Sequence, residues 1–312
     1  MQRHRVVMLL LHAALIFTAE AAFESVSETF GKVLNPFGGH SAVQRQDYIK
    51  VIGAGLGRTG TSSLHAALTI LGYKTYHMEE MLKDGTHAET FADLADGRAT
   101  AENVMDMLLS SGFNATMDFP TADLFAEQLD RYPDAKVILS VRDSGEQWAK
   151  SWRALMDPAP LFDREFSLLW PSFLQWVPAI RALTKVRCWF GTHTIGLDKC
   201  ELSHGFIDRP DTWLPEQYEA HNARVKAAVP PEKLLIYNIK EGWAPLCRFL
   251  DKEIPAVPLP HANDSGFLKR VKVFVYIIVY AWIPFLLLLI YLLYRCALCC
   301  RLQSGSAKRK QS

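Results

Sequence analysis

The sequence has almost no net charge, because its 34 Lys and Arg residues are matched by 33 Asp and Glu residues. A chain balanced in this way has no electrostatic field that would attract a polyanion, so a nucleic acid is not an expected partner. Internal repeats and low-complexity runs are also absent. A chain of 312 residues of this kind holds one large domain or two small ones.

Charged residues are missing from a stretch near the C-terminus, between Val273 and Tyr294. As a helix this stretch is roughly 33 Å long, enough to cross a hydrocarbon core of about 30 Å. A helix of this length in a soluble core would show a polar face, and this one shows none. The sequence therefore predicts a transmembrane helix over residues 271–294, followed by a basic tail over residues 295–312.

The N-terminus has the pattern of a secretory signal peptide. Two arginines precede a short apolar run, and Ala19-Glu20-Ala21 forms a small-x-small cleavage site, so we predict a signal over residues 1–21. Residues 22–47 contain turn formers and little periodicity, and we expect a stalk there. Together with the basic tail, these features predict a single-pass membrane protein of the endoplasmic reticulum or Golgi with a luminal domain. A tail-anchored protein with a cytosolic domain is the alternative.

Six cysteines are present, and three of them follow the apolar stretch directly. Cys188 and Cys200 could pair in an oxidising lumen, whereas Cys247 lies in an apolar, helix-like segment and is expected to be a buried thiol. His193 and His204 alternate with the first two cysteines, but these spacings match no common zinc finger. No metal is expected.

Between the stalk and the apolar stretch, residues 48–268 are predicted to form the main domain. Short β-rich runs alternate with helical ones, which favours a parallel sheet with helices on both faces, a three-layer α/β/α fold. The alternation stops over residues 157–214, which are rich in aromatic residues and proline and are predicted to be a helical insertion. The expected strands are 48–54, 73–77, 114–117, 136–141 and 233–239, and the expected helices are 61–71, 101–111, 122–132, 145–156 and 215–228.

A glycine-rich turn follows the first of these strands and leads at once into a helix. Glycines let backbone amides point inward, and the start of a helix adds unsatisfied donors, so such a turn is suited to hold an anion. A nucleoside-triphosphatase turn would need a lysine where Thr61 stands. The dinucleotide fingerprint is met by Gly55, Gly57 and Gly60, with Glu79 near the position of a ribose ligand. An NAD(P)-dependent oxidoreductase is therefore one possible function.

The run that begins at Arg58, Arg-Thr-Gly-Thr-Ser-Ser-Leu, resembles the 5′-phosphosulfate loop of sulfotransferases. This resemblance implies a fold related to that of P-loop nucleotide-binding proteins, with 3′-phosphoadenosine 5′-phosphosulfate (PAPS) as co-substrate. A guanidinium beside the bridging oxygen would stabilise the charge that develops there as the sulfonate leaves. The residues that this resemblance assigns to PAPS are Gly57, Arg58, Thr59, Gly60, Thr61, Ser62 and Ser63.

Two further segments are similar to the same family. Arg142 ends a strand and Ser151 follows on the next helix, as in the 3′-phosphate motif, although the spacing is one residue longer than the family pattern. Residues 234–264, with the run Lys240-Glu-Gly-Trp-x-Pro-Leu-Cys-x-Phe-Leu, resemble the C-terminal strand and helix of one sulfotransferase-like branch. Lys240 is a further candidate for phosphosulfate binding.

A sulfotransferase also needs a base for the acceptor hydroxyl or amine. Asp118 follows the third strand and is the favoured candidate, with His77, at the end of the second strand, as the next. The acceptor is not identified by the sequence, and a glycan or a lipid headgroup is expected only from the predicted location. A non-catalytic nucleotide-binding membrane protein is the third possible function.

Overall fold

The computed structural model describes residues 46–156, 178–197 and 209–262, together with 273, 277, 280 and 282–295. The predicted signal, stalk and tail lie almost entirely outside these residues, as does much of the aromatic insertion. Among the described residues, no helix has both the length and the hydropathy that crossing a membrane requires. The predicted transmembrane segment, residues 271–294, is described only in part.

Five parallel strands form one sheet in the order β2-β3-β1-β4-β5. β1 is central, and its Ile52 is in register with Thr116 of β3 and Val137 of β4. All five strands fall within the segments that the sequence predicts. Their bounds are β1 Val51–Gly53, β2 Thr75–Tyr76, β3 Ala115–Thr116, β4 Lys136–Ser140 and β5 Leu234–Tyr237.

Helices connect these strands, and five of them match the segments expected from the sequence pattern. α3 and α4, which follow β2, were missed. The side chain of Asp84 caps α4 by accepting hydrogen bonds from the backbone amides of Thr86 and His87. The helices are α2 Thr61–Ile70, α3 Met78–Lys83, α4 Gly85–Ala95, α5 Ala101–Ser110, η1 Thr121–Leu124, α6 Phe125–Arg131, α7 Gly145–Met156, α8 Pro178–His193, α9 Trp213–Ala228, η4 Pro231–Lys233, η5 Ile239–Glu241 and α10 Trp243–Leu250.

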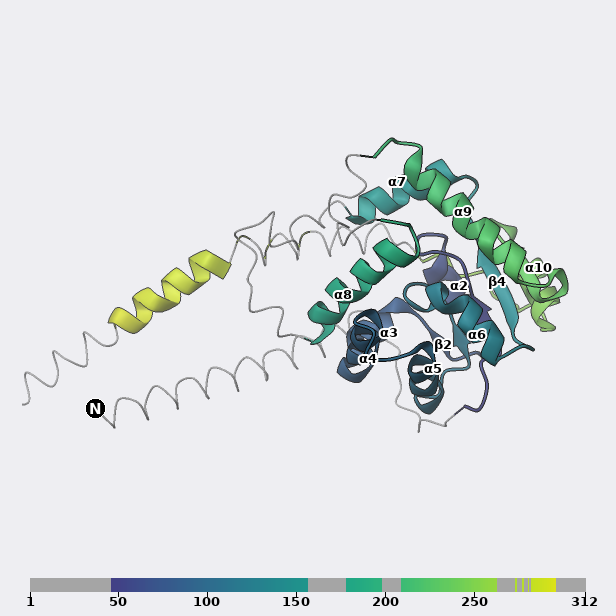
Figure 1. The fold of residues 1–312 in the computed structure, drawn as a ribbon, viewed down its shortest axis with the longest axis horizontal. Coiled ribbons are helices and arrows are strands. Elements are labelled where there is room, and N and C mark those ends of the chain that lie inside the picture. The colour runs from purple at the N-terminus through teal and green to yellow at the C-terminus, as the bar shows by residue number, and fades with distance from the viewer. Residues whose placement is uncertain are drawn as a thin grey trace, which may run out of the picture.

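The sheet is covered on both faces, as the alternation of side chains along a strand requires. Val51 points to the face where α2 and α10 pack, and its neighbour Ile52 points to the face covered by α5, α6 and α9. This arrangement confirms the predicted α/β fold with a central parallel sheet, and Figure 1 shows α9 and α10 beside β4.

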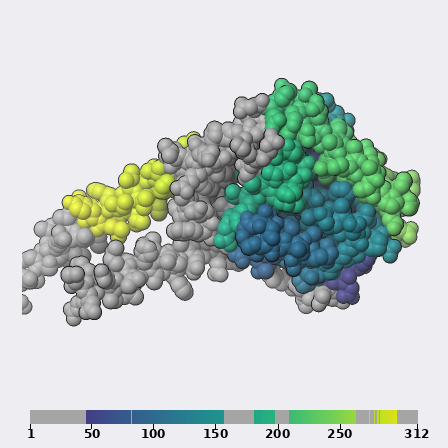
Figure 2. Space-filling model, viewed as in Figure 1, coloured from purple at the N-terminus to yellow at the C-terminus, as the bar shows by residue number. Residues whose placement is uncertain are grey.

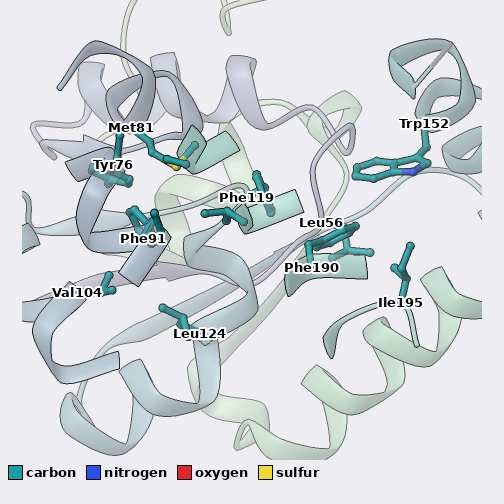
Figure 3. Close-up of a cluster of buried hydrophobic side chains, with 14 of the residues drawn as sticks. Leu56, Tyr76, Met81, Phe91, Val104, Phe119, Leu124, Trp152, Phe190 and Ile195 are labelled. Atoms are coloured by element: carbon teal, nitrogen blue, oxygen red, sulfur yellow. The ribbon is translucent and has the colours of Figure 1, made fainter. Parts of the chain in front are cut away.

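A third cluster of buried side chains joins the described part of the aromatic insertion to the domain. α8 packs along α4, as Figure 2 shows from outside. Phe190 of α8 lies against Trp152 of α7 at 5.1 Å between ring centroids, and against Phe119 at 5.4 Å (Figure 3). These rings are 9% exposed or less, so this part of the insertion is hydrophobic core.

Candidate active site

The turn between β1 and α2 presents the start of a helix at the centre of the sheet. Gly60 is the N-cap residue in a left-handed conformation (φ 94°), and no side chain caps the helix. The first turn of α2 contains no acidic residue. Its backbone amides therefore lack an internal partner and suit an anion.

Side chains from the neighbouring strand and helix hold this turn in shape. The hydroxyl of Thr59 donates to the carbonyl of Leu56 at 2.7 Å and accepts from Oγ of Ser140 at 2.6 Å. Nε1 of Trp148 donates to the carbonyl of Gly57 at 2.8 Å. The Thr59 hydroxyl is therefore engaged in hydrogen bonds within the protein, and only the backbone amide of Thr59 is left to bind a phosphate.

The second predicted motif lies directly beside the first. Nε of Arg142 donates to the carbonyl of Arg58 at 2.6 Å, and Nε of Arg58 donates to Oγ of Ser151 at 3.1 Å. The extra residue between Arg142 and Ser151 thus leaves Ser151 within reach of the turn. Arg58 and Ser151, which the resemblance assigns to opposite ends of PAPS, therefore contact each other.

The two candidate bases form a buried pair on the other side of the turn. Nε2 of His77 lies 3.2 Å from Oδ2 of Asp118 and 3.4 Å from Oγ1 of Thr61. A Cβ placed on Gly57 would lie 3.0 Å from Oδ1 of Asp118. One carboxylate oxygen therefore contacts His77 while the other faces the glycine turn.

Arg58 and Asp118 share an uncommon backbone conformation. Their φ angles are 75° and 63°, in a region that L-residues with a side chain rarely adopt. Asp251, at the end of α10, is the other described non-glycine residue of this kind. Strained backbone of this type gathers at functional sites, where the surrounding structure holds it.

His65 is a neighbour of this site that the sequence pattern did not predict. It lies one turn after Thr61 on α2, and its ring centroid is 5.3 Å from that of His77. Burial, and then the proximity of His77, lower the pKa of His65 to about 4. Its Nε2 lies 3.2 Å from the carbonyl of Thr75, which can only accept, so the neutral ring donates there.

The remaining predicted ligands lie at the rim of the turn. Ser62 is half-buried, and Oγ of Ser63 accepts from the backbone amide of Ala262 at 2.9 Å. Lys240 is exposed and forms an ion pair with Asp143, so the structure places it beside the Arg142 motif.

The acidic residue that the dinucleotide interpretation requires lies in α3, outside the turn. Glu79, the predicted ribose ligand of a dinucleotide-binding protein, has its Oε2 3.8 Å from Nζ of Lys83 in α3. The described residues contain no group of three potential metal ligands. Cys188 is in a disulfide, while Cys200 lies outside the described ranges, and Cys247 is a buried free thiol as predicted.

Comparison with known proteins fits this geometry. Residues 50–268 match the sequence model of the sulfotransferase domain, which covers the whole sheet and both phosphate motifs. The chain belongs to the sulfotransferase domain family. This sulfotransferase-family protein is also similar to "Ava biosynthesis cluster protein M" of Aspergillus versicolor, with 32% identity over 236 residues, or 70% of this chain and 82% of the relative.

Proposed function

We propose that this protein is a PAPS-dependent sulfotransferase that transfers a sulfonate to a hydroxyl or amine. The contact of Arg58 with Ser151, next to Arg142, carries the proposal, because it joins the two phosphate motifs at one turn. Family membership supports sulfotransfer chemistry, and the choice of PAPS rests on the residues of these motifs.

The residues of the turn fit a phosphosulfate. The first amides of α2 have no side-chain cap, and the guanidinium of Arg58 lies at the same turn. Gly57 leaves the space between the turn and Asp118 open, since a Cβ there would come to 3.0 Å from the carboxylate. PAPS would supply the sulfonate group and leave as 3′-phosphoadenosine 5′-phosphate (PAP).

In the proposed reaction, the bond between sulfur and the bridging phosphate oxygen breaks while a bond from sulfur to the acceptor oxygen or nitrogen forms. Arg58 stabilises the negative charge that passes to the phosphate oxygen. Asp118 takes the acceptor's proton, because its Oδ1 faces the turn while Oδ2 contacts His77. His77 orients the carboxylate, in the way that a third group orients a catalytic base.

Calorimetric titration of the full-length protein with PAP, NADH and NADPH tests this proposal. We expect PAP to bind and the nicotinamide nucleotides not to bind. Binding of NADPH without PAP would replace the sulfotransferase by an oxidoreductase. Binding of none of the three would favour a non-catalytic membrane protein.

A glycan or lipid headgroup is our proposed acceptor, presented to a luminal, membrane-anchored domain. The described helical residues 282–295 support an anchor, because Phe285 and the nine residues after it are all substantially exposed and apolar or aromatic.

Incubating glycan and lipid extracts with radiolabelled PAPS would identify the acceptor. Protease treatment of sealed microsomes tests the topology, since digestion of the domain in intact vesicles would place it in the cytosol.

A further inference from the structure

One helix outside both phosphate motifs contacts the backbone of each. α9 crosses the ends of β1 and β4, and three of its residues, Pro215, Tyr218 and His221, contact this region. Pro215 packs so closely on Gly145 that a Cβ there would meet it at 3.1 Å. The other two contacts come from Tyr218 and His221, each three residues further along α9.

Tyr218 is the second of these contacts and reaches the Arg142 motif. Its hydroxyl accepts a hydrogen bond from the backbone amide of Arg142 at 2.9 Å. Its ring is 1% exposed and stacks on Trp148 with 5.1 Å between centroids. Trp148 in turn donates to the carbonyl of Gly57. Tyr218 therefore supports the 3′-phosphate motif directly and the glycine turn through one neighbour.

His221 is the third contact and reaches the start of the glycine turn. Its Nε2 lies 2.7 Å from the carbonyl of Ala54, which can only accept, so the proton is on Nε2. Nδ1 is then an acceptor, and Nη2 of Arg224 lies 3.4 Å from it. Arg224 also donates to the carbonyl of Thr194 at 3.0 Å. His221 is 1% exposed, and both of its ring nitrogens have hydrogen-bond partners.

We propose that α9 fixes the separation of the two phosphate motifs, with Tyr218 and His221 as positioning residues that touch neither phosphate. This inference rests on the proposed function, because it takes PAPS as the ligand that spans both motifs. A ligand held at two ends needs both ends at the right separation, and a misplacement of about 1 Å can cost about 10²-fold in rate. Each buried hydrogen bond from α9 resists such a shift.

The two residues should give different kinetic signatures, because they hold different motifs. Tyr218→Phe keeps the stack on Trp148 but leaves the Arg142 amide without its acceptor. It should weaken PAP binding and raise the KM for PAPS by about 5- to 10-fold, with little change in kcat. His221→Leu should instead lower kcat by about 10-fold, because the turn that carries Arg58 begins at Ala54.

Two further variants separate positioning from general stability. His221→Gln places a donor near the position of Nε2 and should restore most of the kcat lost in His221→Leu. Val225→Ala, in the buried part of α9 and without a side-chain hydrogen bond to either motif, should lower Tm while leaving PAP binding and kcat unchanged. If Tyr218→Phe and His221→Leu behave like Val225→Ala, the positioning role is wrong.

A measurement without ligand keeps this inference distinct from the proposed function. Amide exchange at Arg142 should be about 10-fold faster in Tyr218→Phe than in the wild type and unchanged in Val225→Ala. Wild-type protein that fails to bind PAP would overturn the proposed function. Unchanged exchange at Arg142 in Tyr218→Phe would overturn the role of α9 whether or not PAP binds.

Discussion

Replacing Gly57 by alanine tests the assignment of Asp118 most directly. The new methyl group would lie 3.0 Å from Oδ1 of Asp118 and 3.8 Å from Cζ3 of Trp152. The first distance is shorter than an ordinary contact, so the carboxylate must move by a few tenths of an ångström. Gly57 does not have a positive φ, so the backbone itself accepts alanine. The perturbation is therefore confined to the space between the turn and the candidate base.

A small movement of a catalytic group has a large effect on rate and a small one on stability. We expect Gly57→Ala to cost about 1 kcal/mol of unfolding free energy, the lower end of what overpacking costs. The rate of sulfonate transfer from radiolabelled PAPS should fall by about 10- to 100-fold, because the base no longer meets the acceptor's proton in line. PAP affinity, measured by calorimetry, should change less than about 3-fold, because the amides of the turn stay in place.

Two other glycines serve as controls. At Gly55 a Cβ would lie 2.1 Å from Oγ of Ser140 and 2.5 Å from its carbonyl oxygen, so Gly55→Ala should unfold or strongly destabilise the protein. At Gly85 a Cβ meets nothing, so Gly85→Ala should leave both activity and PAP binding unchanged. If Gly57→Ala keeps full activity, or loses PAP binding in step with activity, Asp118 does not act beside this turn.

Three further predictions concern two arginines of the site and two buried histidines near it. Arg58→Ala should lower kcat by about 10²- to 10³-fold and weaken PAP binding less, and Arg58→Lys should recover part of the lost kcat. Undiminished turnover in Arg58→Ala would contradict the role of Arg58. Arg142→Ala should chiefly raise the KM for PAPS, because the 3′-phosphate is remote from the sulfur; a loss confined to kcat would contradict this. Acid should destabilise the fold, because burial lowers the pKa of His65 and of His221 from 6.5 to about 4. As the pH falls from 6.5 towards 4, these rings therefore bind protons in the unfolded chain but not in the folded protein. The lowered pKa of His221 alone should reduce the free energy of unfolding by about 2 kcal/mol at pH 5 relative to pH 7. Chemical denaturation at both pH values measures this loss, and His221→Gln should reduce it.

Local patterns determined much of this protein. The alternation of β-rich and helical runs predicted all five strands and the parallel sheet, because each run carries its own period of apolar residues. The run from Arg58 to Ser63 placed the glycine turn at the start of α2, because turn and helix are adjacent in the chain. α3 and α4 were missed, since their helical pattern is interrupted by Asp84 and Gly85 at the boundary.

Contacts between distant segments were decided only by the tertiary structure. The sequence singled out His77 and Asp118 separately, and the adjacent ends of β2 and β3 bring them to 3.2 Å. His65 becomes a neighbour of His77 because α2 packs beside β2. The contacts of Tyr218 and His221 with Arg142 and Ala54 have no local signature. They arise because α9 packs across the ends of β1 and β4, which is a property of the whole fold.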